Sequence, residues 1–144
     1  FTHLSPNFPF SPQITLSPLL KVFIIPAGII NTLSRGDKVI CGENGKFGER
    51  WVKVAKEFGL EVIKIDSEWG TPLDPEEFKK VLEEDKQKEI KAVILTHSET
   101  STGVINDLET ISSYIRAHKT AVLCARIYEL IVSKSLITPV EVSE

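Results

Sequence analysis

Residues 91–104 read KAVILTHSETSTGV, an apolar run followed directly by a dense polar segment. The run at 92–95, AVIL, has the length and the apolar content of a strand that is buried on both faces. The polar segment at 97–104 then crowds hydroxyl-bearing and acidic residues into one loop. In open α/β sheets, ligands bind at loops that leave the carboxyl ends of the strands. The stretch therefore predicts a buried strand that ends in a binding loop for a small molecule.

Upstream of this strand, strand-like and helix-like patterns alternate. Residues 38–41 form a short β-rich run, and the apolar side chains after it recur at helical spacing until Gly59, which fits the position just past a helix end. A second strand is expected over residues 60–65, and Asp74 with Pro75 is typical of a helix start. The inward-facing stripes of these two helices are Phe47, Trp51, Ala55 and Phe58, and then Phe78, Val81 and Leu82.

Downstream of the polar loop, the same alternation continues. Asp107 can cap a helix whose Leu108, Ile111 and Ile115 face inward, and the apolar residues 121–124 predict a fourth strand. Strands that alternate with helices predict an α/β fold with a layered, mainly parallel sheet and flanking helices.

The beginning of the chain follows a different pattern. Residues 1–18 contain four prolines and no hydrophobic period. We therefore expect residues 1–30 to form an extended or poorly ordered leader and residues 31–144 to form the folded α/β domain. The chain contains no methionine, not even at position 1, so we expect it to be less than a complete natural reading frame.

The composition is that of one globular domain of 144 residues, 42% of them apolar and 26% charged. A net charge of -3 without a basic stripe argues against a nucleic-acid partner. The longest apolar run, residues 19–30, is interrupted by Lys21 and Pro26 and is too short to span a bilayer, so no membrane association is expected. Cys41 and Cys124 lie far apart without metal-type spacing, which favours a reducing, cytoplasmic location and predicts no metal site.

A glycine-rich turn at residues 42–48, GENGKFG, separates the first expected strand from its helix. Backbone amides in such a turn, together with the helix N-terminus, can hold an anion. With Asp66 at the end of the next strand, the turn partly matches a dinucleotide-binding fingerprint, but its glycines are three apart and the fingerprint needs two that are separated by a single residue. Two interpretations stay open: a nucleotide-binding α/β module, or a structural turn built on Asn44-Gly45 with Phe47 in the core.

The polar loop also has two interpretations. The hydroxyl groups of Thr100, Ser101 and Thr102 can hydrogen-bond a phosphate or a phenolic oxygen, and His97 can stack on a ligand or donate to it. Alternatively, one hydroxyl caps a turn, Gly103 supplies a positive φ, and His97 is a structural histidine whose hydrogen bonds are satisfied.

Several motifs occur together and in order: GDKV at 36–39, NGKFGERW at 44–51, EWG at 68–70, DPEE at 74–77 and HSETSTGV at 97–104. With these motifs the chain resembles the class V pyridoxal-phosphate-dependent aminotransferases, specifically the alanine–glyoxylate and serine–pyruvate branch. The resemblance extends from Asn31 to about Leu123. It implies that the α/β domain is part of the large domain of a pyridoxal-phosphate transferase.

The resemblance implies a cofactor, a reaction and two binding residues. Phe47 matches the position of an aromatic ring that stacks on the pyridine face of pyridoxal phosphate. Thr100 matches a hydroxyl that bonds the phenolic oxygen of the cofactor. The implied reaction moves an amino group between an amino acid and a 2-oxo acid such as glyoxylate or pyruvate, in a homodimer whose active sites take residues from both subunits.

Lys134 is, by the same resemblance, the candidate for the lysine that forms a Schiff base with the cofactor. It opens the segment KSLITP at 134–139, which fits the family pattern except that Ser133 replaces the usual glutamine. Residues 21–27, KVFIIPA, replace a Ser-Gly-Thr loop that grips the cofactor phosphate, and Cys124 replaces an aspartate that keeps the pyridine nitrogen protonated. Only ten positions separate Cys124 from Lys134, as if a segment had been lost between them.

Three interpretations follow from the sequence. The chain derives from an aminotransferase large domain, with transamination as the activity of intact relatives. Alternatively, it is a truncated or degenerate α/β fragment that folds without catalysis, or it is a nucleotide-binding module that uses the glycine turn.

Overall fold

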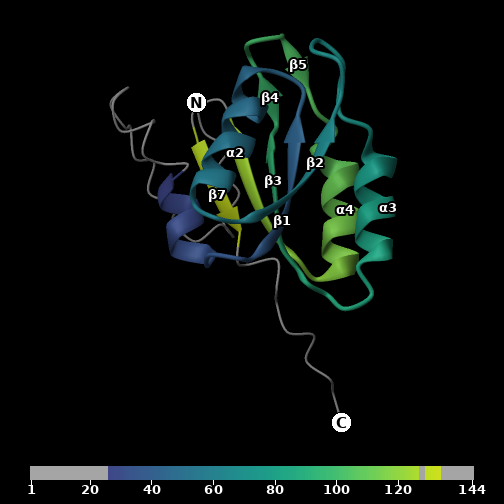
Figure 1. Ribbon diagram of the computed structural model, residues 1–144. Coiled ribbons are helices and arrows are strands. Elements are labelled where there is room, and N and C mark those ends of the chain that lie inside the picture. The colour runs from purple at the N-terminus through teal and green to yellow at the C-terminus, as the bar shows by residue number, and fades with distance from the viewer. Residues whose placement is uncertain (1–25, 127–128, 134–144) are drawn as a thin grey trace, which may run out of the picture.

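The computed structural model describes residues 26–126 and 129–133 (Figure 1). Residues 26–32 form a short helix in which Ile29 is buried together with Val39 and Trp51. Residues 26–30 therefore belong to the folded domain, although the sequence pattern placed them in the leader. The physical reason is that Ile29 gains an apolar contact with the core, while a proline such as Pro26 is compatible with the first turn of a helix. Residues 1–25 of the expected leader lie outside the described residues.

A five-stranded sheet forms the centre of the fold. Its strands are β1 (Lys38–Glu43), β2 (Glu61–Asp66), β3 (Ile90–Thr96), β6 (Ala121–Arg126) and β7 (Glu129–Ser133). They lie in the order β2-β1-β3-β6-β7, with all neighbours parallel except β7, which pairs with β6 in the antiparallel direction. The predicted mainly parallel sheet is confirmed.

The central strands β1 and β3 are buried on both faces. Because side chains alternate along a strand, Val39 and Ile40 enter different hydrophobic clusters. On β3, Ile94 joins Val39, and Leu95 joins Ile40. Continuous apolar runs such as 92–95 are what a parallel sheet requires when helices cover both of its faces.

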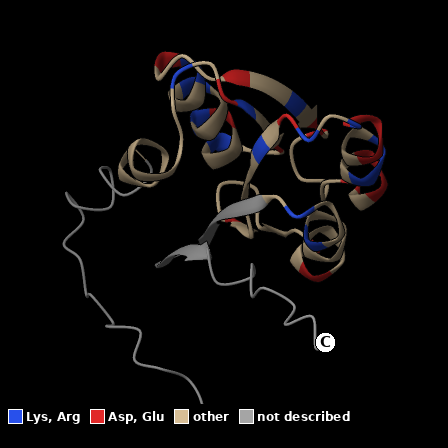
Figure 2. Ribbon diagram, turned by 90° about the horizontal axis from the view of Figure 1, so that it is seen from below, with Lys and Arg blue, Asp and Glu red and all other residues tan. Residues whose placement is uncertain are grey.

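Helices cover the two faces of the sheet (Figure 1). Helix α2 (Lys46–Glu57) packs on one face, and α3 (Pro75–Glu84) and α4 (Leu108–His118) lie side by side on the other. Each of the three helices carries basic as well as acidic residues, as the colours of Figure 2 show. The buried helix residues are Gly48, Trp51, Val52 and Ala55 of α2, Phe78 and Leu82 of α3, and Ile111, Ile115 and His118 of α4.

The helix ends lie where the sequence predicts them. The Asp74 carboxylate accepts a hydrogen bond from the Glu76 backbone amide at 3.0 Å and so caps α3. Asp107 caps α4 through the backbone amide of Thr110, also at 3.0 Å. Helix α2 ends just before Gly59, whose φ of +76° is favourable for glycine.

A small hairpin follows β3, formed by β4 (Ser98–Glu99) and β5 (Val104–Ile105) in antiparallel pairing. It projects beyond the end of β3 (Figure 1). The sequence predicts only a loop here, because two-residue strands are too short to show a hydrophobic period. The predicted positive φ of Gly103 is confirmed at +75°.

Candidate functional site

The glycine turn and the polar loop meet at one edge of the sheet. Residues 44–48 follow β1 and residues 97–104 follow β3, and these two strands are parallel neighbours. Their carboxyl ends therefore lie at the same edge, beside the N-terminus of α2 (Figure 1). The backbone amide of Lys46 donates a hydrogen bond to Ser101 Oγ at 2.9 Å, which joins the two segments directly. This is the edge at which parallel α/β sheets bind ligands.

Phe47 lies in the first turn of α2 with 38% of its surface exposed. The interpretation of Phe47 as ordinary core is therefore wrong. The buried stripe of the helix begins one residue later, at Gly48, where a Cβ would lie only 2.8 Å from the carbonyl oxygen of Gly42. The close approach of this first turn to β1 thus leaves room only for glycine and directs Phe47 outward. Its exposed ring is available to stack on a flat ligand.

Thr100 is exposed and lies between the two strands of the hairpin. The residues on both sides of it are bonded to the first turn of α2: Phe47 N donates to Glu99 Oε2 at 3.1 Å, and Lys46 N donates to Ser101 Oγ. The structure therefore brings Phe47 and Thr100, the two predicted cofactor-binding residues, to the same edge. Their contacts with a cofactor stay predictions.

The N-terminus of α2 holds an internal anion, the carboxylate of Glu99. This side chain has no exposed surface and accepts hydrogen bonds from the backbone amides of Phe47, Gly48 and Ser101 at 3.1, 3.0 and 3.3 Å, and from the Ser101 hydroxyl. The amides of the turn do hold an anion, as predicted, but it belongs to the chain itself. With these amides occupied, the nucleotide-binding interpretation loses its phosphate site.

The role of Glu99 was missed in the sequence, although one signal pointed toward it. Gly45 occupies the N-cap position of α2 and has no side chain with which to accept a hydrogen bond. The first amides of a helix need acceptors from elsewhere when they are buried. A glycine N-cap before a buried helix start therefore indicates that a distant acceptor must exist, but not which residue provides it.

A second buried polar contact, between Asn44 and Asn106, holds the surrounding loops together. Asn44 Nδ2 donates to Asn106 Oδ1 at 2.9 Å, and the same oxygen accepts from Leu73 N at 2.9 Å. Asn106 Nδ2 donates to the carbonyl oxygen of Thr96 at 2.7 Å, and Asn44 Nδ2 to that of Thr71 at 3.0 Å. The two amides thus connect the ends of β1 and β3 with the segment before α3, a role that the sequence analysis also missed.

The remaining loop residues match the structural interpretation in part. Thr102 Oγ1 donates to the carbonyl oxygen of Glu99 at 3.3 Å, which confirms that a hydroxyl closes a turn. The carbonyl oxygen of His97 accepts from Asn106 N at 2.8 Å. The ring nitrogen Nδ1 of His97, however, is buried without a partner among the described residues. The expectation that the hydrogen bonds of His97 are satisfied is therefore wrong for this nitrogen.

Lys134 lies outside the described residues, directly after the last residue of β7. The same holds for residues 21–25, most of the segment that replaces the phosphate-gripping loop of the family. Cys124 lies in β6, where its backbone pairs with Leu95 of β3. Its place in the strand is close to the sheet edge where Phe47 and Thr100 lie.

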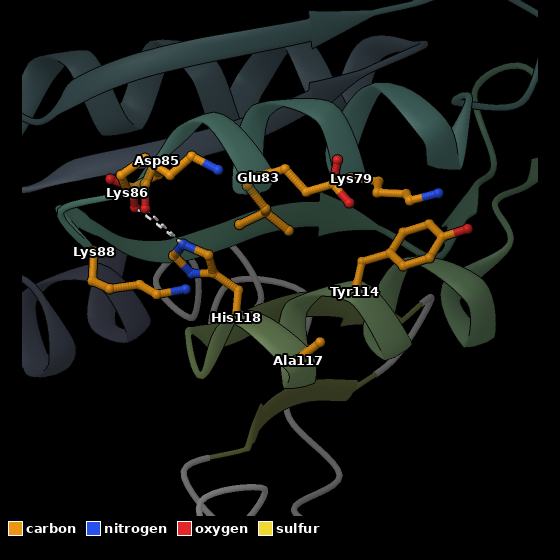
Figure 3. A pocket seen from close by; sticks show the side chains of 9 residues that line it. Lys79, Glu83, Asp85, Lys86, Lys88, Tyr114, Ala117 and His118 are labelled. Atoms are coloured by element: carbon orange, nitrogen blue, oxygen red, sulfur yellow. Dashed lines mark hydrogen bonds and ion pairs between the residues drawn. The ribbon is translucent and has the colours of Figure 1, made fainter.

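A pocket of about 500 Å³ lies at the opposite edge of the sheet, between the C-terminal ends of α3 and α4 (Figure 3). It is lined by both lysines and acidic residues, and by Tyr114 and His118. His118 Nε2 lies 3.3 Å from Asp85 Oδ2, and His118 Nδ1 lies 2.6 Å from Thr120 Oγ1.

The Asp85 carboxylate is also bound by the chain itself. It accepts hydrogen bonds from the backbone amides of Glu89 and Ile90 at 3.0 and 2.9 Å. Burial raises the pKa of Asp85, but the two amides and His118 more than offset this effect, so its pKa lies below the ordinary value. These contacts connect the ends of α3 and α4 with the start of β3, and we call this group of contacts the Asp85–His118 clamp.

The chain has an α/β fold, and the candidate site lies at the carboxyl ends of its parallel strands, an edge that we call the ligand edge. The model of the family "Aminotransferase class-V" matches residues 21–127. The chain belongs to this family.

Two similar proteins carry names of different kinds, a hydrogenase subunit and an aminotransferase. The chain is 59% identical over 99 residues to a protein of Anabaena cylindrica named soluble hydrogenase 42 kDa subunit, covering 69% of this chain and 26% of the relative. It is 39% identical to a serine–glyoxylate aminotransferase of Methylorubrum extorquens over 72% of this chain and 26% of the relative. The chain therefore spans about a quarter of the length of these relatives.

Solved structures show the same fold. The crystal structure of an alanine–glyoxylate aminotransferase from Nostoc superposes with a TM-score of 0.61 at 35% identity, covering 68% of this chain and 25% of the other. Within the described residues, no helix is both long and apolar enough to cross a membrane. Those residues also contain no group of three or more His, Cys, Asp or Glu that could hold a metal ion.

Proposed function

We propose that the chain is part of the large domain of a pyridoxal-phosphate-dependent aminotransferase. The observation that supports this most is the joint placement of an exposed aromatic ring, Phe47, and an exposed hydroxyl, Thr100, at the ligand edge of a class V aminotransferase fold. Both residues are held there by hydrogen bonds between α2 and the hairpin.

In the proposal, two of the described residues would hold one side of the cofactor. The Phe47 ring would lie against the flat face of the pyridine, and the Thr100 hydroxyl would hydrogen-bond the phenolic oxygen. The bound cofactor supplies a carbonyl carbon that takes up an amino group and a ring that stabilises negative charge at the neighbouring carbon. In the proposal, Lys134 provides the amine that holds the cofactor and that moves a proton at the substrate carbon.

The substrates in this proposal are an amino acid and a 2-oxo acid such as glyoxylate or pyruvate. The serine–glyoxylate and alanine–glyoxylate aminotransferases among the relatives support this substrate class. We further propose a cytoplasmic homodimer. The name of the Anabaena relative refers to a hydrogenase, and the proposal follows instead the aminotransferase family whose model matches residues 21–127.

The test is to add pyridoxal phosphate to the chain, reduce with borohydride and locate the pyridoxyl group by mass spectrometry. We expect saturable binding and modification of Lys134, with Lys134→Ala losing the modification and Lys53→Ala, a change at an exposed lysine of α2, retaining it. Amino-group transfer from serine or alanine to glyoxylate is then measured by product formation. Absence of both binding and modification would support the non-catalytic fragment instead.

A further inference from the structure

Among the residues that the structure describes, Glu99 is the one acidic side chain of the ligand edge that is completely buried. A buried carboxylate is stable only when hydrogen bonds and a favourable field compensate for its lost hydration. Here the backbone amides of Phe47 and Gly48 donate to Oε2 at 3.1 and 3.0 Å, at the positive end of the α2 dipole. The Ser101 hydroxyl and amide donate to Oε1.

The fit around this carboxylate is tight. A Cβ on Gly45 would overlap the Cγ and Cδ atoms of Glu99, so the helix start can come this close only because residue 45 is glycine. The amides of three successive residues, 46–48, all donate to the segment 99–101. The first turn of α2 and the tip of the hairpin are therefore joined into one rigid unit.

This unit carries both ligand-facing groups. Phe47 gives its amide to Glu99 and presents its ring to solvent, while Thr100 lies between the two residues that bind the helix. The distance between ring and hydroxyl consequently depends on the Glu99 carboxylate. A glutamine would keep the volume but would place an NH₂ group against N–H donors.

We infer that Glu99 is a positioning residue that fixes the Phe47 ring relative to the Thr100 hydroxyl, so that one flat ligand contacts both. The inference rests on the proposed function, because it takes pyridoxal phosphate as that ligand. Glu99 itself is enclosed by its hydrogen-bond donors and would not touch the cofactor.

The test compares Glu99→Gln with Glu49→Gln, which removes a negative charge from the first turn of α2, where Glu99 binds, but breaks only ion pairs with lysines. Binding of pyridoxal phosphate is measured by equilibrium dialysis. We expect Glu99→Gln to weaken binding at least about tenfold and Glu49→Gln to change it less than about twofold. In ligand-free protein, amide hydrogen exchange at Phe47 and Gly48 should accelerate only in Glu99→Gln.

A double-mutant cycle separates positioning from general destabilisation. If Glu99 acts through Phe47, Glu99→Gln should have little further effect on binding in a Phe47→Ala background. Equal binding by wild type and Glu99→Gln would overturn the inference, as would full additivity with Phe47→Ala. If the wild type itself binds no cofactor, the proposed function fails, and unchanged amide exchange in Glu99→Gln would then overturn the positioning role independently.

Discussion

Phe47 and Glu99 occupy environments opposite to those that their side chains usually prefer, since the aromatic ring is exposed and the carboxylate is buried. Each placement explains the other. The carboxylate can be buried because the amides at the start of α2 bind it, and the same bonds hold Phe47 at the edge of the helix. An exposed aromatic residue fixed by its backbone is suited to stacking on a ligand.

Gly48→Ala tests how closely the start of α2 approaches β1. Alanine normally stabilises a helix interior by up to about 1 kcal/mol relative to glycine. At this position its Cβ would lie 2.8 Å from both Glu43 Cα and the Gly42 carbonyl oxygen, so the backbone must shift. We expect a net loss of roughly 1–3 kcal/mol in the free energy of unfolding, measured by urea denaturation. Lys56→Ala, on the exposed side of the same helix, should change it by less than about 0.5 kcal/mol. A more stable Gly48→Ala variant would contradict the close approach.

At this scale, the sequence predicts little of the site. Helical spacing places Phe47 on the same face of the helix as Trp51. In the structure the buried face begins at Gly48 instead, because the helix start lies close against β1. In the sequence, Glu99 is 52 residues from Phe47 and 51 residues from Gly48, whose amides it binds. No local sequence pattern therefore contains both the carboxylate and its donors. Phe47 and Thr100 could be named because a family resemblance already includes their tertiary placement.

Among the elements, those with a full hydrophobic period were predictable and the short ones were not. The two capped helices α3 and α4 follow directly from Asp74 and Asp107, because a cap acts on amides two or three residues away. The hairpin β4–β5 and the antiparallel strand β7 depend on partners elsewhere in the fold. Their pairing therefore becomes visible only in three dimensions.

The Asp85–His118 clamp predicts a dependence of stability on pH. The pKa of Asp85 is lower in the folded chain than its ordinary value of 3.8. The unfolded chain therefore binds more protons in this range, so the contribution of Asp85 is fully present above that value and is lost as the pH falls through the folded pKa. His118 and Lys38 both lower the pKa of this carboxylate.

The measurement for this prediction is the urea midpoint as a function of pH for wild type and Asp85→Asn. We expect the two curves to lie furthest apart at neutral pH and to converge on acidification below about pH 4. Asp74→Asn serves as the control, because asparagine is an equally good helix N-cap and the difference from wild type should stay small throughout. Curves of wild type and Asp85→Asn that run parallel down to low pH would contradict the role of the Asp85 charge.

Across the whole molecule, each edge of the sheet holds a carboxylate that accepts hydrogen bonds from backbone amides, Asp85 at one edge and Glu99 at the other. Near the ends of α3 and α4, Asp85 also contacts His118, with 3.3 Å between Oδ2 and Nε2 (Figure 3). At the ligand edge, neutral side-chain amides make further connections, and Asn106 by itself joins Asn44, Leu73 and Thr96. These amides pair with polar groups of the loops and add no second buried charge close to Glu99. A second buried charge would compete with Glu99 for its hydrogen-bond donors.

Asn106→Ala should therefore affect the entire ligand edge rather than one loop. It removes the acceptor for the Leu73 amide and for Asn44 Nδ2, and the donor to the Thr96 carbonyl, all in a buried environment. Unpaired buried polar groups cost about 1–3 kcal/mol each, and partial relaxation leaves an expected loss of roughly 2–4 kcal/mol in the free energy of unfolding. Amide exchange should accelerate at Leu73, in the segment before α3, and also in the hairpin.

Asn31→Ala is the matched control, because the Asn31 side chain is exposed and donates only to the carbonyl oxygen of Ala27, four residues earlier. Its loss should stay below about 0.5 kcal/mol. If exchange in Asn106→Ala increased only next to the substituted residue, the loops would be independent of one another, and the ligand edge would not be the single connected unit that these hydrogen bonds indicate.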